Sequence, residues 1–230
     1  MENVIVMLVY FISSNLNQVI FDFRLRYSIR EVIGANMKIE DEKDKAFVQA
    51  LKKATRKAFI DLFNEHSDER FYYCTLVMMN AQGYPIVSAM SEEALEKILQ
   101  EYKEKYGWTP ENNRRMLKWS FADSPYCAYG EQYFTDVQKM IDERDLDIGD
   151  DEEDDEKFME EYEFRMDSME KVMSDLDKEG IFGSGEKRKN IVVAAEVMPP
   201  EYTNTERVLR LNSRETLKEW LEEAAEMEEY

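Results

Sequence analysis

Residues 71–89 read FYYCTLVMMNAQGYPIVSA, and this stretch decides the fold class. Its first part, Phe71 to Met79, is rich in the aromatic and other β-forming residues that are typical of strands. Residues 80–83 supply turn-forming asparagine and glycine, and a second strand-like run follows from Tyr84 to Ala89. The pattern therefore predicts a β-hairpin.

Helical periodicity surrounds this hairpin on both sides. Apolar residues recur at steps of three and four from Asp44 to Asn64, as one buried face of a helix requires. Ser91 is placed to cap a second helix, because its hydroxyl can accept a hydrogen bond from a free amide of the first turn. We expect a third helix from about Glu131 to Glu143 and a fourth from Phe158 to Gly180.

Further strands are expected in three places along the chain. The runs Met116 to Phe121, Asn190 to Val197 and Arg207 to Leu211 are candidates, and Ser213 can cap a last helix that runs through Met227. Strand runs that alternate with helices and include a tight hairpin favour an α+β fold. We expect a mixed or mainly antiparallel sheet that is covered by helices.

The N-terminal segment differs in composition from the rest of the chain. Residues 1–36 hold three acidic and three basic residues, so the remaining residues carry the whole net charge of −20. We expect residues 37–230 to form a single α+β domain. Residues 1–36 are then an N-terminal extension, or Met37 is the natural start.

An apolar run from Val4 to Ile12 lies within this segment. No basic residues precede it and no small-residue cleavage site follows, which argues against a signal peptide. Extending the run to Phe23 would include Asn15 and Asp22, which are costly in a bilayer, so we expect no membrane span.

Negative charge is concentrated in one part of the sequence. Between Asp142 and Glu163 there are fourteen acidic and two basic residues, a local net charge of −12. We interpret residues 145–157 as an acidic insertion whose core, 150–156, is either a solvated linker or the approach to a helix. The charge repels nucleic acids and anionic lipids, and it would attract a basic protein partner.

Few side chains have obvious catalytic potential. Cys74 and Cys127 are isolated, which indicates reduced thiols and a cytoplasmic location. His66, the chain's single histidine, could act with Asp68 and Glu69 in acid–base chemistry, or it could simply stabilise a helix end. One histidine is too few for a typical zinc site, and we expect no cofactor.

Aromatic residues are clustered in the 116–121 run and in the residues that follow it. They could line an interface, where such rings contribute much of the binding energy, or they could pack the core. The residues that we select for partner binding combine the acidic run with three of these rings: Asp150, Asp151, Glu152, Glu153, Asp154, Asp155, Glu156, Trp119, Tyr126 and Tyr129.

Several landmarks occur together in this chain: Arg56-Lys57-Ala58-Phe59 at a helix end, the polar turn Glu65 to Tyr72, Lys118-Trp119-Ser120, and Gly180-Ile181-Phe182-Gly183 before a strand. With these landmarks the sequence resembles the bacterial domain-of-unknown-function family 4303, from about Lys45 to Trp220. The family has no established activity, so the resemblance transfers no functional residue. Small acidic bacterial families of this kind are similar in character to immunity proteins, which neutralise a toxin by covering it.

Three hypotheses of function follow from the sequence, and the third of them is a structural or regulatory module of a homo-oligomer, which predicts an apolar surface patch. The first is a non-enzymatic binding protein of a bacterial cytoplasm, of the kind in which an immunity protein binds a basic toxin. The alternative is a hydrolase or transferase whose site is built from carboxylates, with or without a divalent metal, because the chain is rich in carboxylates and poor in other reactive groups. This alternative predicts convergent acids of raised pKa.

Overall fold

The computed structural model describes residues 42–79, 83–144 and 152–227. These residues belong to one compact unit, Ile39–Tyr230. The N-terminal segment 1–36 lies outside the described residues, and its assignment as an extension stays a prediction. Within the described ranges, no helix is both long and apolar enough to cross a membrane.

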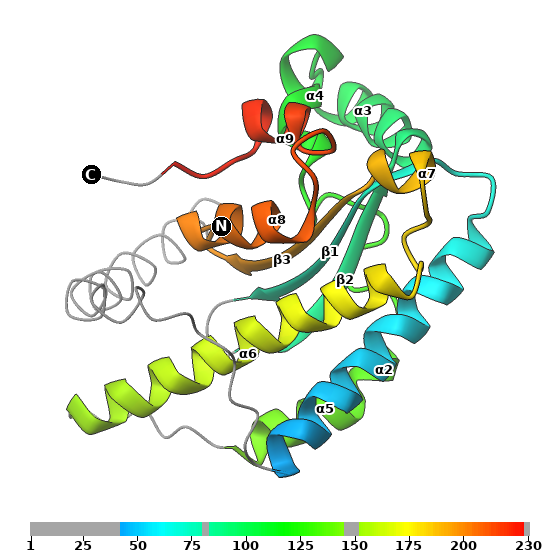
Figure 1. Ribbon diagram of the computed structural model, residues 1–230. Coiled ribbons are helices and arrows are strands. Elements are labelled where there is room, and N and C mark those ends of the chain that lie inside the picture. Colours follow the sequence, from blue (N-terminus) through cyan, green and yellow to red (C-terminus); the bar gives the residue numbers. More distant parts are fainter. Residues whose placement is uncertain (1–41, 80–82, 145–151, 228–230) are drawn as a thin grey trace. The chain divides into compact units, whose positions relative to one another are not determined.

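The described elements are helices arranged around a small sheet (Figure 1). In chain order they are α2 (Glu42–Glu65), β1 (Phe71–Met79), β2 (Pro85–Ser91), α3 (Glu92–Tyr106), α4 (Pro110–Lys118), η1 (Glu131–Phe134), α5 (Thr135–Asp142), α6 (Glu152–Lys178), α7 (Glu186–Lys189), β3 (Val192–Met198), α8 (Tyr202–Leu211) and α9 (Lys218–Glu223).

The three described strands form one mixed sheet in the order β2-β1-β3. β1 pairs with β2 antiparallel, with Leu76 opposite Val87, which confirms the predicted hairpin. On its other side β1 pairs with β3 in parallel, with Leu76 opposite Ala195. The predicted α+β class with a mixed sheet is confirmed.

The apolar face of α2 forms much of the core under this sheet. Its buried residues include Phe47, Leu51, Phe59 and Leu62, which recur at helical spacing as the sequence predicted. Figure 1 shows α2 and α6 on the same side of the sheet, and Phe59 packs edge-on against Phe182 with ring centroids 5.0 Å apart.

Two predicted strands are wrong. The 116–121 run ends a helix, α4, which begins with Pro110 in its first turn and buries Leu117. The 207–211 run is the second half of α8, whose buried residues Asn204, Val208 and Leu211 recur at steps of four and three. Short apolar runs do not distinguish strand from helix by themselves, and here the helical period governs.

Two other boundaries differ from the prediction. The last helix covers Lys218–Glu223 only, rather than the full stretch from Ser213. α6 already starts at Glu152, so most of the acidic run is the beginning of a helix and not a linker.

The free edge of β3 forms hydrogen bonds with side chains of α8 and with Asn212, the residue that follows α8. Asn204 accepts from the amide of Val197 (2.9 Å) and donates to its carbonyl (3.0 Å). Asn212 makes the same pair of bonds with Val193, at 2.9 and 2.7 Å. Between them, Arg207 Nε donates to the carbonyl of Ala195 (3.0 Å). The asparagines thus act as a neighbouring strand would.

The match depends on the different rises of helix and strand. From 204 to 212 a helical path covers about 12 Å, at about 1.5 Å per residue. From Val197 back to Val193 the strand covers about 13 Å, at about 3.3 Å per residue. An antiparallel helix can therefore place a polar side chain at every second residue of the strand edge, here at Val193, Ala195 and Val197. Figure 1 shows α8 lying along β3 in this way.

A loop performs the same task at the outer edge of β2. The hydroxyl of Ser124 donates to the carbonyl of Ala89, and the amide of Tyr129 donates to the carbonyl of Val87 at 3.1 Å. Ser88 in turn donates to the carbonyl of Phe121 at 2.9 Å. Both edges of the described sheet are therefore covered, since an open edge would leave backbone groups unpaired.

The Asn204→Ala variant tests the edge contact. It leaves the buried amide and carbonyl of Val197 without partners, and we expect a loss of unfolding free energy of about 1–3 kcal/mol for each group. Urea denaturation measures this loss. The control is Asn190→Ala, which removes an exposed side-chain bond to Glu186 and is expected to cost less than about 0.5 kcal/mol. Equal losses in both variants would contradict the role of Asn204.

Candidate functional site

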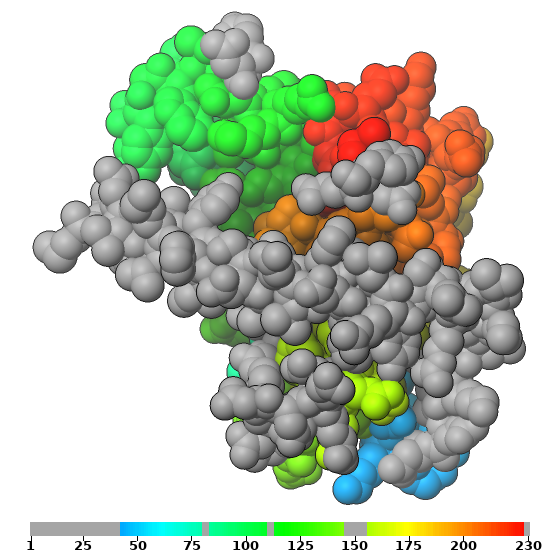
Figure 2. Space-filling model, turned by 90° about the vertical axis from the view of Figure 1, so that its left-hand side faces the viewer, coloured from blue at the N-terminus to red at the C-terminus, as the bar shows by residue number. Residues whose placement is uncertain are grey.

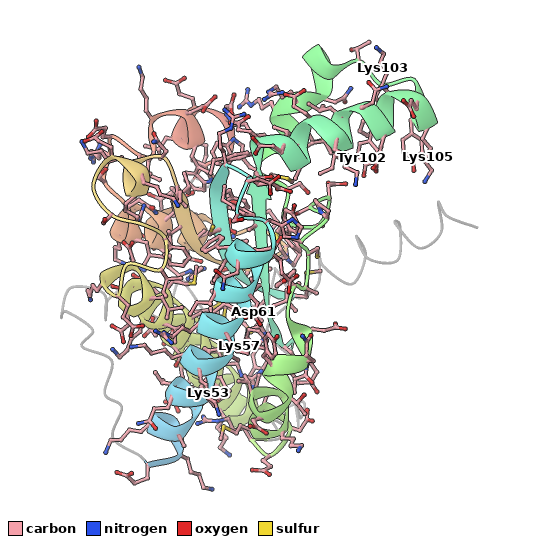
Figure 3. All side chains as sticks on the ribbon, turned by 90° about the vertical axis from the view of Figure 1, so that its right-hand side faces the viewer. Lys53, Lys57, Asp61, Tyr102, Lys103 and Lys105 are labelled. Carbon is pink, nitrogen blue, oxygen red and sulfur yellow. The ribbon has the colours of Figure 1, made fainter. Side chains whose placement is uncertain are left out.

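Three tyrosines dock the 124–134 segment onto carboxylates at the end of α2. Tyr133 donates to Asp61 (2.5 Å), Tyr129 to Glu65 (2.5 Å) and Tyr126 to Glu69 (2.6 Å). We call these six residues the tyrosine–carboxylate ladder. Figure 3 shows Asp61 following Lys53 and Lys57 along the outward side of α2.

The spacing of the acids explains the ladder. Residues four apart in a helix lie on the same face, so Asp61 and Glu65 point to one side of α2. The chain continues in a turn, in which the amide of Glu69 donates to the carbonyl of His66 at 3.1 Å, and this turn brings Glu69 into line with the other two acids.

Burial and the acceptors keep Tyr126 and Tyr129 of the ladder neutral. Desolvation raises the pKa of Tyr126 and of Tyr129, and the neighbouring Glu69 and Glu65 carboxylates raise them further. Each phenol is therefore a neutral donor to an anion. Asp61 differs, because Lys57 first and Tyr133 second lower its pKa.

Of the predicted grouping of His66 with Asp68 and Glu69, the structure shows the contact with Glu69, whereas Asp68 is exposed. His66 Nδ1 lies 3.3 Å from Glu69 Oε1 and 3.2 Å from the hydroxyl oxygen of Tyr126. Since Tyr126 gives its only proton to Glu69, Nδ1 must carry the proton in these contacts. Sequence reasoning found His66 and Glu69 but did not connect them to Tyr126.

Ser91 completes this polar group from the other side. Its hydroxyl donates to Glu69 and accepts from the amide of Ala94 at 2.9 Å, which confirms the predicted helix cap. Ser91 is fully buried, and both of its hydrogen bonds hold the start of α3. The geometry makes it a structural link between α3 and the ladder and gives it no approach to a substrate.

Neither cysteine resembles an activated nucleophile. Both are free thiols; Cys74 is buried in β1 and Cys127 is half-buried in the loop. Burial raises the pKa of Cys74 and, together with Asp123, that of Cys127. A thiolate is therefore disfavoured at both positions.

Trp119 lies apart from the ladder tyrosines in its contacts. Its indole donates to Glu223 at 2.8 Å, and its ring packs edge-on against Tyr72 and Tyr73. It lines a shallow hollow of about 390 Å³ together with Arg115, Met116, Glu223 and Ala224. Figure 2 shows this region, where the green atoms of the α3–α4 segment lie against the red atoms near the C-terminus.

The selected acidic residues fall at the start of α6. Asp150 and Asp151 lie outside the described residues, whereas 152–156 belong to the first turns of the helix, and Glu156 is exposed. Acids suit this position because they offset the positive end of the helix dipole. The structure therefore brings Tyr126 and Tyr129 together and places Trp119 in other contacts; a binding role for all the selected residues stays a prediction.

Sequence reasoning missed a buried acid in the sheet. Glu196 of β3 is 9 % exposed and accepts hydrogen bonds from Tyr73 and from Thr75 (2.5 Å). Desolvation raises its pKa, and the nearby Glu226, whose own pKa is raised by burial, acts in the same direction. The available signal was an acidic residue inside the apolar run VVAAEVM.

In the described part of the chain, no cluster of three or more histidine, cysteine, aspartate or glutamate residues is arranged to hold a metal ion. Glu196 and Glu226 are two acids whose pKa values are both raised by burial. They are the closest counterpart to the convergent acids that a carboxylate enzyme requires.

Comparison with known proteins identifies the family. A family model described as a domain of unknown function, DUF4303, matches residues 51–213, which is more than half of the chain. The chain belongs to the DUF4303 family. The DUF4303 match includes the three described strands and the asparagines that cover β3. No curated protein and no solved structure matches.

The Glu69→Ala variant tests the ladder. It removes the acceptor of both Tyr126 and Ser91, and we expect a loss of about 1–3 kcal/mol in unfolding free energy, measured by urea denaturation. Asp68→Ala is the control, since Asp68 is exposed and adjacent in sequence, and it should change stability by less than about 0.5 kcal/mol. Equal effects would show that the hydrogen bonds of Glu69 do not stabilise the fold.

The raised pKa of Glu196 predicts a pH dependence. Above pH 4.5, the ordinary glutamate value, the unfolded chain releases a proton that the folded protein keeps. Stability must therefore fall as pH rises from there through the folded-state pKa. Glu196→Gln should reduce this fall in a series of urea titrations, leaving the part due to Glu226, whereas exposed Glu101→Gln should not. An unchanged slope in Glu196→Gln would mean that Glu196 is ionised in the fold.

Proposed function

We propose that this protein is a non-enzymatic binding module whose partner is a basic protein. The proposal rests mainly on the acidic first half of α6. Residues 152–163 hold eight acidic residues and one basic residue. They occupy about 18 Å of helix, at about 1.5 Å per residue.

The helical setting favours binding over a merely solvated tail. The acids belong to a helix of 27 residues that packs on the fold through buried Phe158, Tyr162 and Met166. A preformed helix loses less conformational entropy on association than a flexible acidic linker would. An array of like charges also steers an oppositely charged protein from a distance and accelerates encounter.

The reactive side chains support the same conclusion. Ser91, Glu69 and Tyr126 are hydrogen-bonded to one another, and both thiols are held in their protonated forms. Because these side chains are already hydrogen-bonded or protonated, they are poorly placed to act as nucleophiles or general bases. An immunity-type role in a bacterial cytoplasm, in which the protein covers a basic toxin domain, fits an anionic helix on a rigid α+β body.

The experiment is affinity purification of the tagged full chain from its native cell at low and moderate salt. We expect a basic partner that is retained at low salt and lost as salt rises, because screening shortens the range of the attraction. A variant with 152–156 neutralised to glutamine and asparagine should weaken the purified interaction by about tenfold or more, as measured by titration calorimetry.

The control variant neutralises five exposed acids elsewhere: Asp68, Glu101, Glu131, Asp136 and Glu143. It changes the net charge equally but leaves α6 intact, so partner binding should persist. An equal loss of partner binding in both variants would show that only the net charge matters. Retained binding in both variants would show that α6 is not the binding surface.

A carboxylate-based hydrolase or transferase is the second candidate. The observation in its favour is the pair Glu196 and Glu226, both of raised pKa, with Tyr73 hydrogen-bonded to the first. Metal and substrate screens of the purified chain address it, and turnover that disappears in Glu196→Gln would support it.

A further inference from the structure

The middle of α2 is basic although the chain is strongly acidic. Residues 45–60 hold five basic residues and no acidic one, in a chain whose net charge is −20. Four of the five are close together in the helix: Lys52, Lys53, Arg56 and Lys57. Because an acidic chain repels anions over most of its surface, this stretch is a local exception that can attract them.

Three of these cations line a hollow on the surface of the domain. One stripe of α2 contributes residues that are three and four apart, namely Gln49, Lys52, Lys53 and Arg56. Together with Glu179, which follows α6, they surround a hollow of about 600 Å³. Sites for small molecules have volumes in this range. The lining of this one combines three cations, one carboxylate and one neutral amide.

The acids near the hollow use only part of the surrounding hydrogen-bond donors. Glu179 accepts a hydrogen bond from Arg56 Nε (3.1 Å) and lies 2.9 Å from Lys52 Nζ, which is also 3.5 Å from Asp175. Within the described ranges, the two terminal amino groups of Arg56, the ammonium group of Lys53 and the side-chain amide of Gln49 have no hydrogen-bond or ion-pair partner. Figure 3 shows Lys53 on the outward side of α2.

These unused donors suit an anion with several oxygens. Ammonium and guanidinium groups bind phosphate oxygens through charge-assisted hydrogen bonds, and a guanidinium can do so with two parallel N–H groups. Lys53 and Arg56 are neighbours on the helix surface, with Cβ atoms about 5–6 Å apart. A chain of linked phosphates can therefore contact both residues at once, whereas a single phosphate would leave much of the hollow empty.

We propose that the hollow between α2 and Glu179 binds a polyphosphate group, either free or as part of a nucleotide. The phosphate oxygens accept hydrogen bonds from Lys53, from the terminal amino groups of Arg56 and from the amide of Gln49, and Lys52 adds positive charge. Glu179 opposes the ligand, because its carboxylate repels phosphate and competes for Lys52 and Arg56.

The binding is weak and sensitive to salt. The cations are exposed or half-exposed, so solvent and counterions screen their attraction for the ligand. The inference does not rest on the proposed function, because the hollow contains none of the acids of 152–163.

Titration calorimetry of the full chain with ATP, inorganic triphosphate and adenosine tests the site. EDTA is present throughout, since a divalent cation would otherwise link phosphates to the acidic surface. We expect ATP and triphosphate to bind at low salt and to weaken as salt rises, and adenosine not to bind. Equal affinities would identify the phosphate chain as the whole ligand, and tighter binding of ATP would identify a nucleotide.

The Lys53→Gln/Arg56→Gln variant removes two of the three cations of the hollow and should raise the Kd for triphosphate by about tenfold or more. Its control is Lys139→Gln/Lys218→Gln, which removes two exposed lysines of α5 and α9. The control changes the net charge equally and should leave the Kd within about twofold of that of the unaltered chain.

A variant of opposite sign sharpens the test. Glu179→Gln removes the carboxylate from the hollow and releases the donors of Lys52 and Arg56, so it should lower the Kd for triphosphate several-fold. Urea denaturation checks that each variant is folded. If the double variant does not fold, Lys53→Gln alone removes no described ion pair and should still raise the Kd several-fold.

Four results would overturn the proposal: no binding of triphosphate at millimolar concentration and low salt, equal weakening in the control variant, adenosine that binds as tightly as ATP, or a polyglutamate peptide that binds more tightly than triphosphate. The last result would point to an acidic protein partner instead. The test is separate from that of the proposed function, because all of these variants keep every acid of 152–163.

Discussion

A three-stranded sheet has two edges, and the backbone groups along both must find hydrogen-bond partners. In this domain no further described strand supplies them. At β3 the amides of Asn204 and Asn212 imitate a neighbouring strand, and at β2 a loop does so through Ser124 and Tyr129. The positions of α8 and of the 121–134 segment follow from this requirement, because each must lie close enough to reach the strand.

A second constraint is the excess of acids, fifty against thirty bases. Within the described residues, seven tyrosine hydroxyls donate to carboxylates: Tyr73, Tyr84, Tyr102, Tyr126, Tyr129, Tyr133 and Tyr162. A phenol offers a donor without a counter-charge, and its ring fills apolar space at the same time. In this chain tyrosine therefore supplies many of the hydrogen-bond donors to carboxylates that lysine and arginine supply in a protein with equal numbers of acids and bases.

The parts of the fold that depend on local pattern were predictable from the sequence. The hairpin at 71–89, α2 and the Ser91 cap follow from periodicity and turn chemistry within short windows. α4 and α8 were mistaken for strands because five or six apolar-rich residues do not define a period, and their helical form is decided by what they pack against.

The candidate site likewise combines contacts that the local sequence predicts with contacts that it does not. His66 and Glu69 are three residues apart, so their contact could be expected, but the tyrosine that joins them is nearly sixty residues away. Glu196 stood out only as an acid within an apolar strand, and nothing local indicates that Tyr73 and Thr75 would shelter it. Pairings between distant segments are fixed by topology, which a single sequence does not display.

The tyrosine–carboxylate ladder has a consequence for how the molecule responds to its medium. Its bonds join a neutral donor to an anion, so counterions have little to screen there, while the long-range field of the acidic surface collapses within a Debye length. Ionic strength therefore acts more strongly on exposed ion pairs of this protein, such as that of Lys52 with Glu179, than on the tyrosine–carboxylate bonds. A change in salt concentration is therefore expected to alter what binds to the acidic surface more than it alters the docking of the 124–134 segment on α2.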